Sequence, residues 1–196
     1  MYTPKDPRRV DAAQGFALIA GGLFKKVVVA NTLAGAIVDP VFASPSQFSA
    51  LEVLVGVYGY AVQIYADFSG YTDIAIGVAT LMGFKFPDNF DNPYAAVSIQ
   101  DFWRRWHMTL SRWLRDYLYI PLGGNRGTRV RTYRNLVLTM LLGGLWHGAA
   151  WTFVIWGGYH GALLAWERWR GEAGLRAEDE TPGRLAIRRL TTFHLV

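Results

Sequence analysis

The sequence contains no cysteine, and only 18% of its 196 residues are charged, below the share of roughly 25% that is usual for a soluble domain. Without cysteine the chain has no disulfide scaffold, no thiolate metal ligand and no cysteine nucleophile. Low charge with a positive mean hydropathy of +0.14 excludes an intrinsically disordered protein. Aromatic residues are abundant at 15%, with 8 Trp, and there are 21 Gly. Interfacial aromatics and helical glycines are both enriched in membrane proteins, so the composition indicates a membrane protein.

The longest uncharged stretch, residues 135–166, holds no Asp, Glu, Lys or Arg. Because about 20 apolar residues cross a bilayer, this stretch is predicted to be a membrane segment. Gly143-Gly144 and Gly157-Gly158 allow a break or a re-entrant bend within it. The shorter apolar segments before it also fit core helices of a soluble protein. Beside the long run we interpret them as membrane helices: Ala12–Phe24, Val27–Val38 and Val53–Ala66.

Polar and proline-rich positions interrupt the first half of the chain. We interpret Lys25-Lys26 as a helix end at a membrane interface, because long Lys side chains can reach the headgroups. Asp39-Pro40 and Ser44–Ser46 predict a loop, since proline removes a backbone donor and pushes the preceding residue out of the helical region. Ser49 followed by Glu52 predicts the start of the next helix.

Residues 98–134 are strongly basic, with eight Arg against two Asp. Ser98 and Asp101 form a helix-capping signature, and apolar side chains then recur at three- and four-residue steps. The pattern predicts a basic amphipathic helix that lies in the membrane interface and ends at the glycine-rich loop Pro121–Gly127. The positive-inside rule predicts that this segment faces the cytoplasm. Beyond the apolar run, the mixed charges of Glu167–Arg189 predict a solvated loop.

Four histidines are present, and His147 is the most unusual because it lies inside the uncharged run. An ionisable side chain in a membrane segment indicates a functional role, and neutral imidazole can act as a general base. The alternative is a neutral histidine hydrogen-bonded between helices. His107 lies on the apolar face of the basic helix, which is typical of a packed core residue, and we expect an interfacial position for His160. The spacings match no common zinc pattern, so we predict no metal site.

The chain lacks the motifs of several enzyme classes: G-x-S-x-G, the Walker A loop and G-x-G-x-x-G in a strand–helix context. The arginines of residues 98–134 and the loop Gly123–Gly127 can bind phosphates of a donor through charge and backbone N–H groups. Arginine mixed with tryptophan also occurs in nucleic-acid-binding proteins, but the direct connection to an apolar span favours membrane topology. We therefore expect membrane lipid, and no nucleic acid, as a partner.

Five motifs follow one another along the chain: Gln63–Gly77, Asn89–Tyr94, Phe102–Ser111, Trp113–Asn125 and Leu141–Gly148. The third contains Arg-Arg-Trp-His and the fifth contains Trp-His-Gly. In this order they resemble the bacterial members of the MBOAT family, the membrane-bound O-acyltransferases, and the resemblance extends from Gly22 to Val196. It implies an all-α, polytopic membrane protein in which residues 1–196 belong to a single membrane domain, with helices around a central funnel.

The resemblance also implies roles for individual residues. The family's catalytic histidine, in its Trp-His-Gly motif, corresponds to His147, and a second histidine, in Arg-Arg-Trp-His, corresponds to His107. A positioned imidazole can take the proton of an acceptor hydroxyl as the hydroxyl attacks a thioester carbonyl, and apolar surroundings favour the neutral imidazole that this step needs. The residues predicted to bind substrate lie in the same motifs: Trp106, Arg104, Arg105, Asn125 and Trp146.

The resemblance further implies a reaction and its partners. An acetyl group passes from a cytoplasmic thioester, acetyl-CoA or another acyl thioester, to a hydroxyl of an alginate-like exopolysaccharide or of a partner protein. A periplasmic acetyltransferase is the expected partner, and no bound cofactor is expected. The expected location is the bacterial inner membrane, crossed several times. Family members carry further membrane helices at both ends, so we expect this chain to be a central fragment.

Two other functions fit the same composition. In a transporter, His147 and a broken glycine-rich helix would line a pathway at the membrane midplane. In a scaffold of a polysaccharide export and modification complex, the chain would bind partners without catalysing a reaction. The ordered motifs favour the acyltransferase over both.

Overall fold

The structure, a computed structural model, describes residues 10–175 and 177–196, and these residues form helices and loops without a β-strand. The predicted all-α class is therefore confirmed. The chain divides into two compact units, one that ends at Asp88 and one that spans Asn89–Val196. The polar start of the sequence, residues 1–9, lies outside the described residues.

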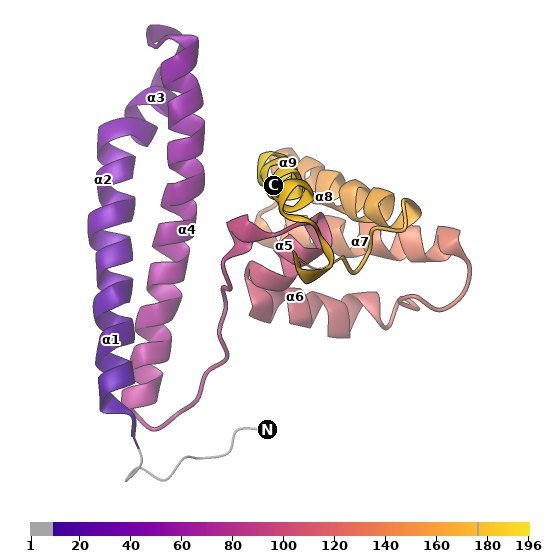
Figure 1. The fold of residues 1–196 in the computed structure, drawn as a ribbon, viewed down its shortest axis with the longest axis horizontal. Coiled ribbons are helices and arrows are strands. Elements are labelled where there is room, and N and C mark those ends of the chain that lie inside the picture. Colours follow the sequence, from indigo (N-terminus) through magenta and orange to yellow (C-terminus); the bar gives the residue numbers. More distant parts are fainter. Residues whose placement is uncertain (1–9, 176) are drawn as a thin grey trace. The chain divides into compact units, whose positions relative to one another are not determined.

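The first unit is a hairpin of two long helical arms (Figure 1). The first arm is a continuous helix in which two π-helical turns, η2 and η3, alternate with α-helical segments. Its elements are α1 (Ala12–Leu23), η2 (Phe24–Ala30), α2 (Asn31–Leu33), η3 (Ala34–Val38) and α3 (Asp39–Ala43). The 3₁₀ turn η4 (Pro45–Gln47) leads to the second arm, α4 (Ala50–Leu81).

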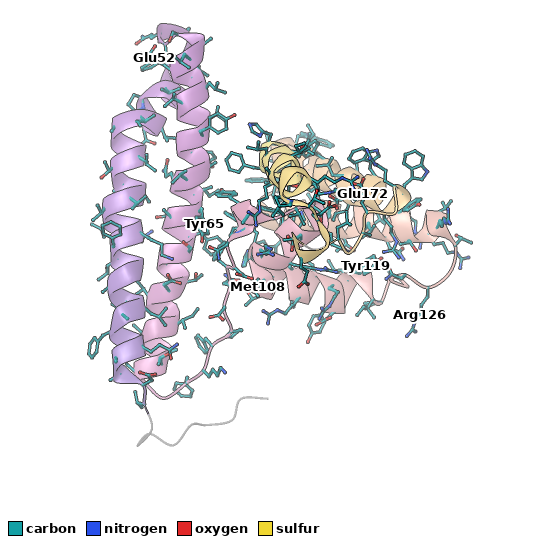
Figure 2. The ribbon with its side chains drawn as sticks, viewed as in Figure 1. Glu52, Tyr65, Met108, Tyr119, Arg126 and Glu172 are labelled. Atoms are coloured by element: carbon teal, nitrogen blue, oxygen red, sulfur yellow. The ribbon has the colours of Figure 1, made fainter. Side chains whose placement is uncertain are left out.

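The start of α4 confirms the predicted cap. The side-chain oxygen of Ser49 accepts the backbone N–H of Glu52 at 3.4 Å, and Oε2 of Glu52 accepts the backbone N–H of Ser49 at 2.7 Å. This reciprocal pair satisfies two backbone donors that the first helical turn leaves without partners. Figure 2 marks Glu52 at this end of the hairpin.

Two predicted interruptions of the first arm are wrong. The helix does not end at Lys25-Lys26, because both charges are paired across the hairpin: Lys25 with Asp73, and Lys26 with Asp67 at 2.5 Å. Asp39-Pro40 is helical rather than a loop. Pro40 lies in the first turn of α3, directly after a π-helical turn, where a missing backbone N–H is tolerated.

The arms of the hairpin touch backbone to backbone. A Cβ added at Gly22 would lie 2.6 Å from the carbonyl oxygen of Gly70, so a larger residue would push the arms apart. By length and composition, the continuous helix Ala12–Ala43 is the one candidate for crossing a membrane among the described residues. The predicted membrane segment 135–166 is not such a candidate, and it is divided between two helices.

The second unit contains five α-helices in its described residues, joined by shorter helical turns (Figure 1). Its elements are η5 (Pro93–Ala95), α5 (Ile99–Arg105), α6 (Met108–Leu114), η6 (Arg115–Tyr119), α7 (Arg129–His147), α8 (Trp151–Trp169), η7 (Ala177–Asp179) and α9 (Pro182–Leu195). Here η6 is a π-helical turn, and η5 and η7 are 3₁₀ turns.

Helices α7 and α8 form a hairpin that divides the long uncharged run. The chain turns at residues 148–150, not at the two glycine pairs that allowed a break. The glycines instead let the helices approach closely: a Cβ at Gly144 would clash with the carbonyl oxygen of Phe153, and one at Gly157 would clash with that of Met140. The hairpin therefore brings the last residue of α7, His147, to its tip.

The basic segment is two helices rather than the single predicted amphipathic helix. The cap at its start is confirmed, because the side chain of Ser98 accepts the N–H of Asp101 at 3.0 Å. The helix then ends at Arg105 and restarts at Met108. The predicted solvated loop Glu167–Arg189 is also wrong in part, since it contains the end of α8 and the first half of α9.

Candidate functional site

His147 is the last residue of α7 and lies beside aromatic rings from both helices of the hairpin. Its ring centroid is 5.0 Å from that of Trp146, 6.1 Å from that of Phe153 and 5.3 Å from that of Trp156. The side chain itself is exposed. An imidazole presented at a helix end and walled on several sides by aromatic rings is accessible to a small substrate on its remaining side.

His107 occupies the bend between α5 and α6, and it belongs to the same neighbourhood. Its ring centroid lies 6.2 Å from that of Trp146, whose ring also contacts His147. Burial, and to a smaller degree the charge of His147, lowers the pKa of His107 to about 4. The structure thus brings together three of the predicted site residues, and His107 is neutral at pH 7.

The backbone at His107 is left-handed, with φ 43° and ψ 55°. Asn92 is the only other non-glycine residue in the described part of the chain with a positive φ. Such a conformation is unfavourable for a residue with a Cβ and is found mainly where surrounding structure enforces it, often at functional sites. This bend is an independent reason to treat His107 as a site residue.

His160 is a buried part of the same aromatic cluster. Its side chain is 2% exposed, so it is packed within the protein. The ring lies between Trp103 and Trp156, at centroid distances of 5.2 and 4.9 Å. Because Trp156 also contacts His147, His160 packs against the side of Trp156 and helps to hold this ring beside the candidate site.

A cavity of about 530 Å³ lies between the basic helices, the loop before α7 and the end of α8. Four arginine side chains line it: Arg104, Arg112, Arg115 and Arg168. Arg115 is paired with Asp116 at 2.7 Å, whereas Arg104 and Arg112 have no acidic partner among the described residues. Figure 2 marks two further lining residues, Met108 and Tyr119. The cavity therefore has a net positive lining that suits an anionic ligand.

Some of the predicted substrate-binding residues line this cavity, and others make contacts to neighbouring side chains of the protein. Arg104 and Asn125 line the cavity, and Asn125 accepts a hydrogen bond from the hydroxyl of Tyr119 at 2.5 Å. Arg105 is instead held by Asp101, with Nε 2.9 Å from the carboxylate. Trp106 stacks on Phe102 at a centroid distance of 5.7 Å. Trp146, whose ring lies beside both histidines, is 60% exposed.

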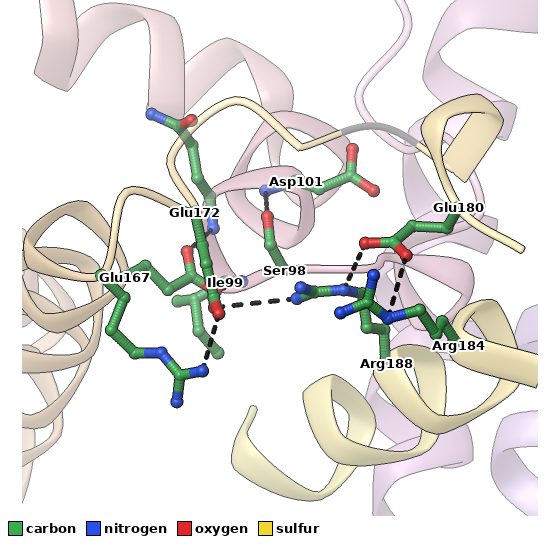
Figure 3. A network of polar contacts seen from close by, with 10 residues as sticks. Ser98, Ile99, Asp101, Glu167, Glu172, Glu180, Arg184 and Arg188 are labelled. Carbon is green, nitrogen blue, oxygen red and sulfur yellow. Dashed lines mark hydrogen bonds and ion pairs between the residues drawn. The ribbon is translucent and has the colours of Figure 1, made fainter.

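A buried carboxylate anchors the start of α5. Glu167 at the end of α8 is 5% exposed, and its two oxygens accept the backbone N–H groups of Ile99 at 2.5 Å and Gln100 at 3.0 Å. Figure 3 shows Glu167 at this helix start, near the ion pair that joins α9 to the chain just after α8: Arg188 lies 3.7 Å from Glu172. This anchor fixes the helix that leads to His107.

Sequence reasoning missed two polar residues that support the site, Asn89 and Glu167. Asn89 belongs to the motif Asn89–Tyr94, which served only as a mark of the family resemblance, and it is 7% exposed. Glu167 is the first charged residue after the uncharged run, a position where an acid is costly without a partner. Among the described residues, no group of three His, Asp or Glu side chains is placed to hold a metal ion.

Comparison with known proteins gives the following relationships. Residues 27–170 match the MBOAT, membrane-bound O-acyltransferase family. A probable alginate O-acetylase AlgI of Azotobacter vinelandii is 56% identical over 156 residues, which is 80% of this chain and 31% of the relative. A protein of the same name from Pseudomonas aeruginosa is 55% identical over 156 residues, 80% of this chain and 30% of the relative. A peptidoglycan O-acetyltransferase of Helicobacter pylori is 52% identical over 145 residues, 74% of this chain and 27% of the relative.

The chain spans less than a third of the length of these curated relatives. The family match nevertheless covers most of the chain, including both candidate histidines and all four arginines that line the cavity. The chain belongs to the membrane-bound O-acyltransferase (MBOAT) family.

Proposed function

We propose that this chain carries the acyl-transfer site of a membrane O-acyltransferase, which moves an acetyl group from a cytoplasmic thioester to a hydroxyl of an exopolysaccharide. The observation that carries the proposal is the meeting of His107 and His147 beside Trp146, at the tip of a helical hairpin. The relatives named as O-acetylases and O-acetyltransferases support the reaction type.

In the proposed reaction His147 is the general base. Its imidazole takes the proton of the acceptor hydroxyl while the oxygen attacks the carbonyl carbon of the thioester. The tetrahedral intermediate then collapses, the carbon–sulfur bond breaks, and the proton held on His147 passes to the leaving thiolate. The products are an O-acetyl ester and a free thiol. His107, neutral because burial lowers its pKa to about 4, offers one hydrogen-bond donor and one acceptor to the reacting groups without adding a charge.

The basic cavity is the proposed site of the donor. Acetyl-CoA and other biological thioesters carry phosphate groups, and arginine binds phosphate with several N–H donors in a fixed plane. Arg104 and Arg112 line the cavity without an acidic partner in the part of the chain that the structure describes, so their charges are available to phosphates. The donor leaves after transfer, and no resident cofactor is part of the proposal.

The names of the relatives support the proposed acceptor. Two of them are named as probable alginate O-acetylases, so the proposed acceptor is an alginate-like polysaccharide, with a hydroxyl of a partner protein as the other candidate. A periplasmic acetyltransferase is the proposed partner. The proposed location is the bacterial inner membrane, crossed several times, with membrane lipid around the helices.

The test follows a radiolabelled acetyl group from the thioester to its acceptor. Because the matched segment is less than a third of each relative, membranes are prepared with this chain alone and with a chimera in which it replaces the matching segment of the Azotobacter vinelandii relative. Labelled polysaccharide in wild-type membranes, with none in His147→Ala membranes, is expected. Label on a protein would identify the second acceptor. Absence of labelled product from every wild-type sample, with acceptor present, would favour the transporter or the scaffold.

A further inference from the structure

Helix α6 begins without a cap from its own first residues. The residue before it, His107, makes no side-chain cap hydrogen bond. The first N–H groups of a helix need partners, since they have none within the helix. In this chain the partners come from a residue that precedes α6 by about twenty positions.

That residue is Asn89, which contacts both of the first two residues of α6. Its backbone oxygen accepts the N–H of Met108 at 2.9 Å. Its side-chain oxygen accepts the N–H of Thr109 at 3.1 Å and the hydroxyl of Thr109 at 2.9 Å. Asn89 is 7% exposed, so water does not compete for these bonds.

The neighbours of Asn89 hold the other side of the bend. The N–H of Asp91 donates to the backbone oxygen of Arg105, the last residue of α5, at 3.0 Å. The ring of Phe90 meets that of Trp106 edge-on at 5.0 Å. Residues 89–91 therefore bridge the end of α5 and the start of α6. The two residues between these anchors are Trp106 and His107, and a short link held at both ends leaves its backbone little freedom.

We propose that Asn89 is a positioning residue for His107: its three hydrogen bonds to Met108 and Thr109 hold the left-handed turn that aims His107 toward the rings beside His147. The proposal rests on the proposed acyl transfer, because it assigns His107 a role in that reaction. Asn89 itself touches no reacting atom. It determines where the imidazole lies rather than whether the acyl donor binds.

The experiment compares substitutions at Asn89 in the acetyl-transfer assay, with the full chain in membranes and within the chimera. Asn89→Leu removes the side-chain acceptor, whereas Asn89→Asp keeps an oxygen at the same place. Because displacement of a catalytic group by about 1 Å costs up to about 100-fold in rate, Asn89→Leu is expected to lower kcat by about 10- to 100-fold with KM for the thioester unchanged. Asn89→Asp is expected to restore most of kcat. Asn92→Gly, which relaxes the other left-handed residue of the same loop, is the matched control and keeps wild-type kcat.

A second readout does not depend on activity. Diethyl pyrocarbonate modifies accessible imidazoles, and mass spectrometry measures the rate at each histidine, with His194 as the internal reference. Loosening of the turn in Asn89→Leu is expected to raise the rate at His107, while Asn89→Asp leaves it unchanged. Thr109→Val, which removes only the hydroxyl bond, is expected to give a smaller rise and keeps the comparison decisive where Asn89→Leu does not accumulate in membranes.

Three outcomes overturn the proposal: wild-type kcat in Asn89→Leu, equal losses in Asn89→Leu and Asn89→Asp, or a loss that lies in KM alone. Absence of acetyl transfer in the wild type would contradict the proposed function. The positioning role of Asn89 would then be tested by the modification rates alone. In that case a higher rate at His107 in Asn89→Leu alone supports the role, and equal rates in all variants overturn it.

Discussion

The rings of His107 and His147 both lie near the ring of Trp146, but the surroundings of the two histidines differ. His147 is exposed at the end of a helix, whereas His107 is half-buried in a left-handed bend. An imidazole whose pKa is held near 4 stays neutral through the range in which an ordinary histidine gains a proton. A neutral imidazole can donate and accept hydrogen bonds without a change of charge. This property suits His107 to orienting the reacting groups beside a general base, rather than to acting as a second base.

The pKa of His107 can be measured directly. Nuclear magnetic resonance titration of its ring proton in detergent micelles is expected to give a midpoint near 4 rather than 6.5. The variant His147→Gln removes a positive neighbour, so the pKa of His107 is expected to rise in it, although burial still keeps it below 6.5. Folded His107 binds a proton more weakly than the unfolded chain does, so the folded state is expected to lose stability as the pH falls from 6.5 towards 4. A wild-type midpoint at 6.5 would contradict the buried position of the ring.

At the residue scale the sequence singled out the two histidines that the structure brings together, but not the residues that hold them in place. His147 stood out because it lies in an uncharged run, and His107 because of its motif. Asn89 and Glu167 gave weaker signals, since their partners lie about 20 and 68 positions away in the sequence. Bonds of that separation depend on how helices pack, which no local pattern encodes. The proposed roles of the two histidines remain predictions.

Helix α5 is held at its start by a carboxylate from another helix. Glu167 supplies one oxygen to each of two backbone N–H groups. The side chain of Ser98 accepts the following N–H group, that of Asp101. A seven-residue helix has little stability of its own. Its position, and with it the bend at His107, therefore depends on these side chains.

Removal of this anchor is expected to destabilise the second unit. Hydrogen bonds to a charged group contribute about 1.5–3 kcal/mol, so Glu167→Ala is expected to lower the unfolding free energy by about that amount, and Glu167→Gln by less because it keeps one oxygen acceptor. Thermal unfolding in detergent, followed by near-ultraviolet circular dichroism, measures the difference. The control is Glu172→Gln, whose ion pairs with Arg170 and Arg188 both involve partly exposed side chains and are expected to contribute less than about 1 kcal/mol each. An equal loss in Glu172→Gln and Glu167→Ala would show that α5 is anchored elsewhere.

At the element scale the predicted caps were right and several predicted helix ends were wrong. Ser49 and Ser98 act locally, through residues three positions away, so their role can be read from sequence. The continuation of the first arm through Lys25-Lys26 depends on acids in α4, more than 40 positions away. The bend at Trp106-His107 likewise depends on residues 89–91. Local signals therefore locate helix starts, and tertiary partners decide where helices bend or continue.

For the whole molecule, the absence of cysteine makes the membrane arrangement testable with single introduced thiols. If the first unit crosses the membrane as a hairpin, Gln47→Cys and Met82→Cys, at opposite ends of α4, are expected to react with an impermeant maleimide from opposite sides. The positive-inside rule predicts that Arg126→Cys, in the exposed loop marked in Figure 2, reacts only in inside-out vesicles. Reaction of the first two from the same side would contradict a crossing. Reaction of the third in intact cells would contradict the cytoplasmic assignment.

The most direct test of the account is the rate at which a labelled acetyl group leaves the thioester for acceptor in a single turnover. The measurement compares wild type, His147→Ala and His194→Ala in chimera membranes with equal amounts of inserted protein. His194 lies in α9, where its ring contacts the backbone oxygen of Leu190 at 2.7 Å, and it has no part in the proposed chemistry. The account predicts transfer at the wild-type rate in His194→Ala and a loss of about 100-fold or more in His147→Ala, as expected for removal of a general base. Equal transfer in wild type and His147→Ala would contradict the assignment of His147 as the base.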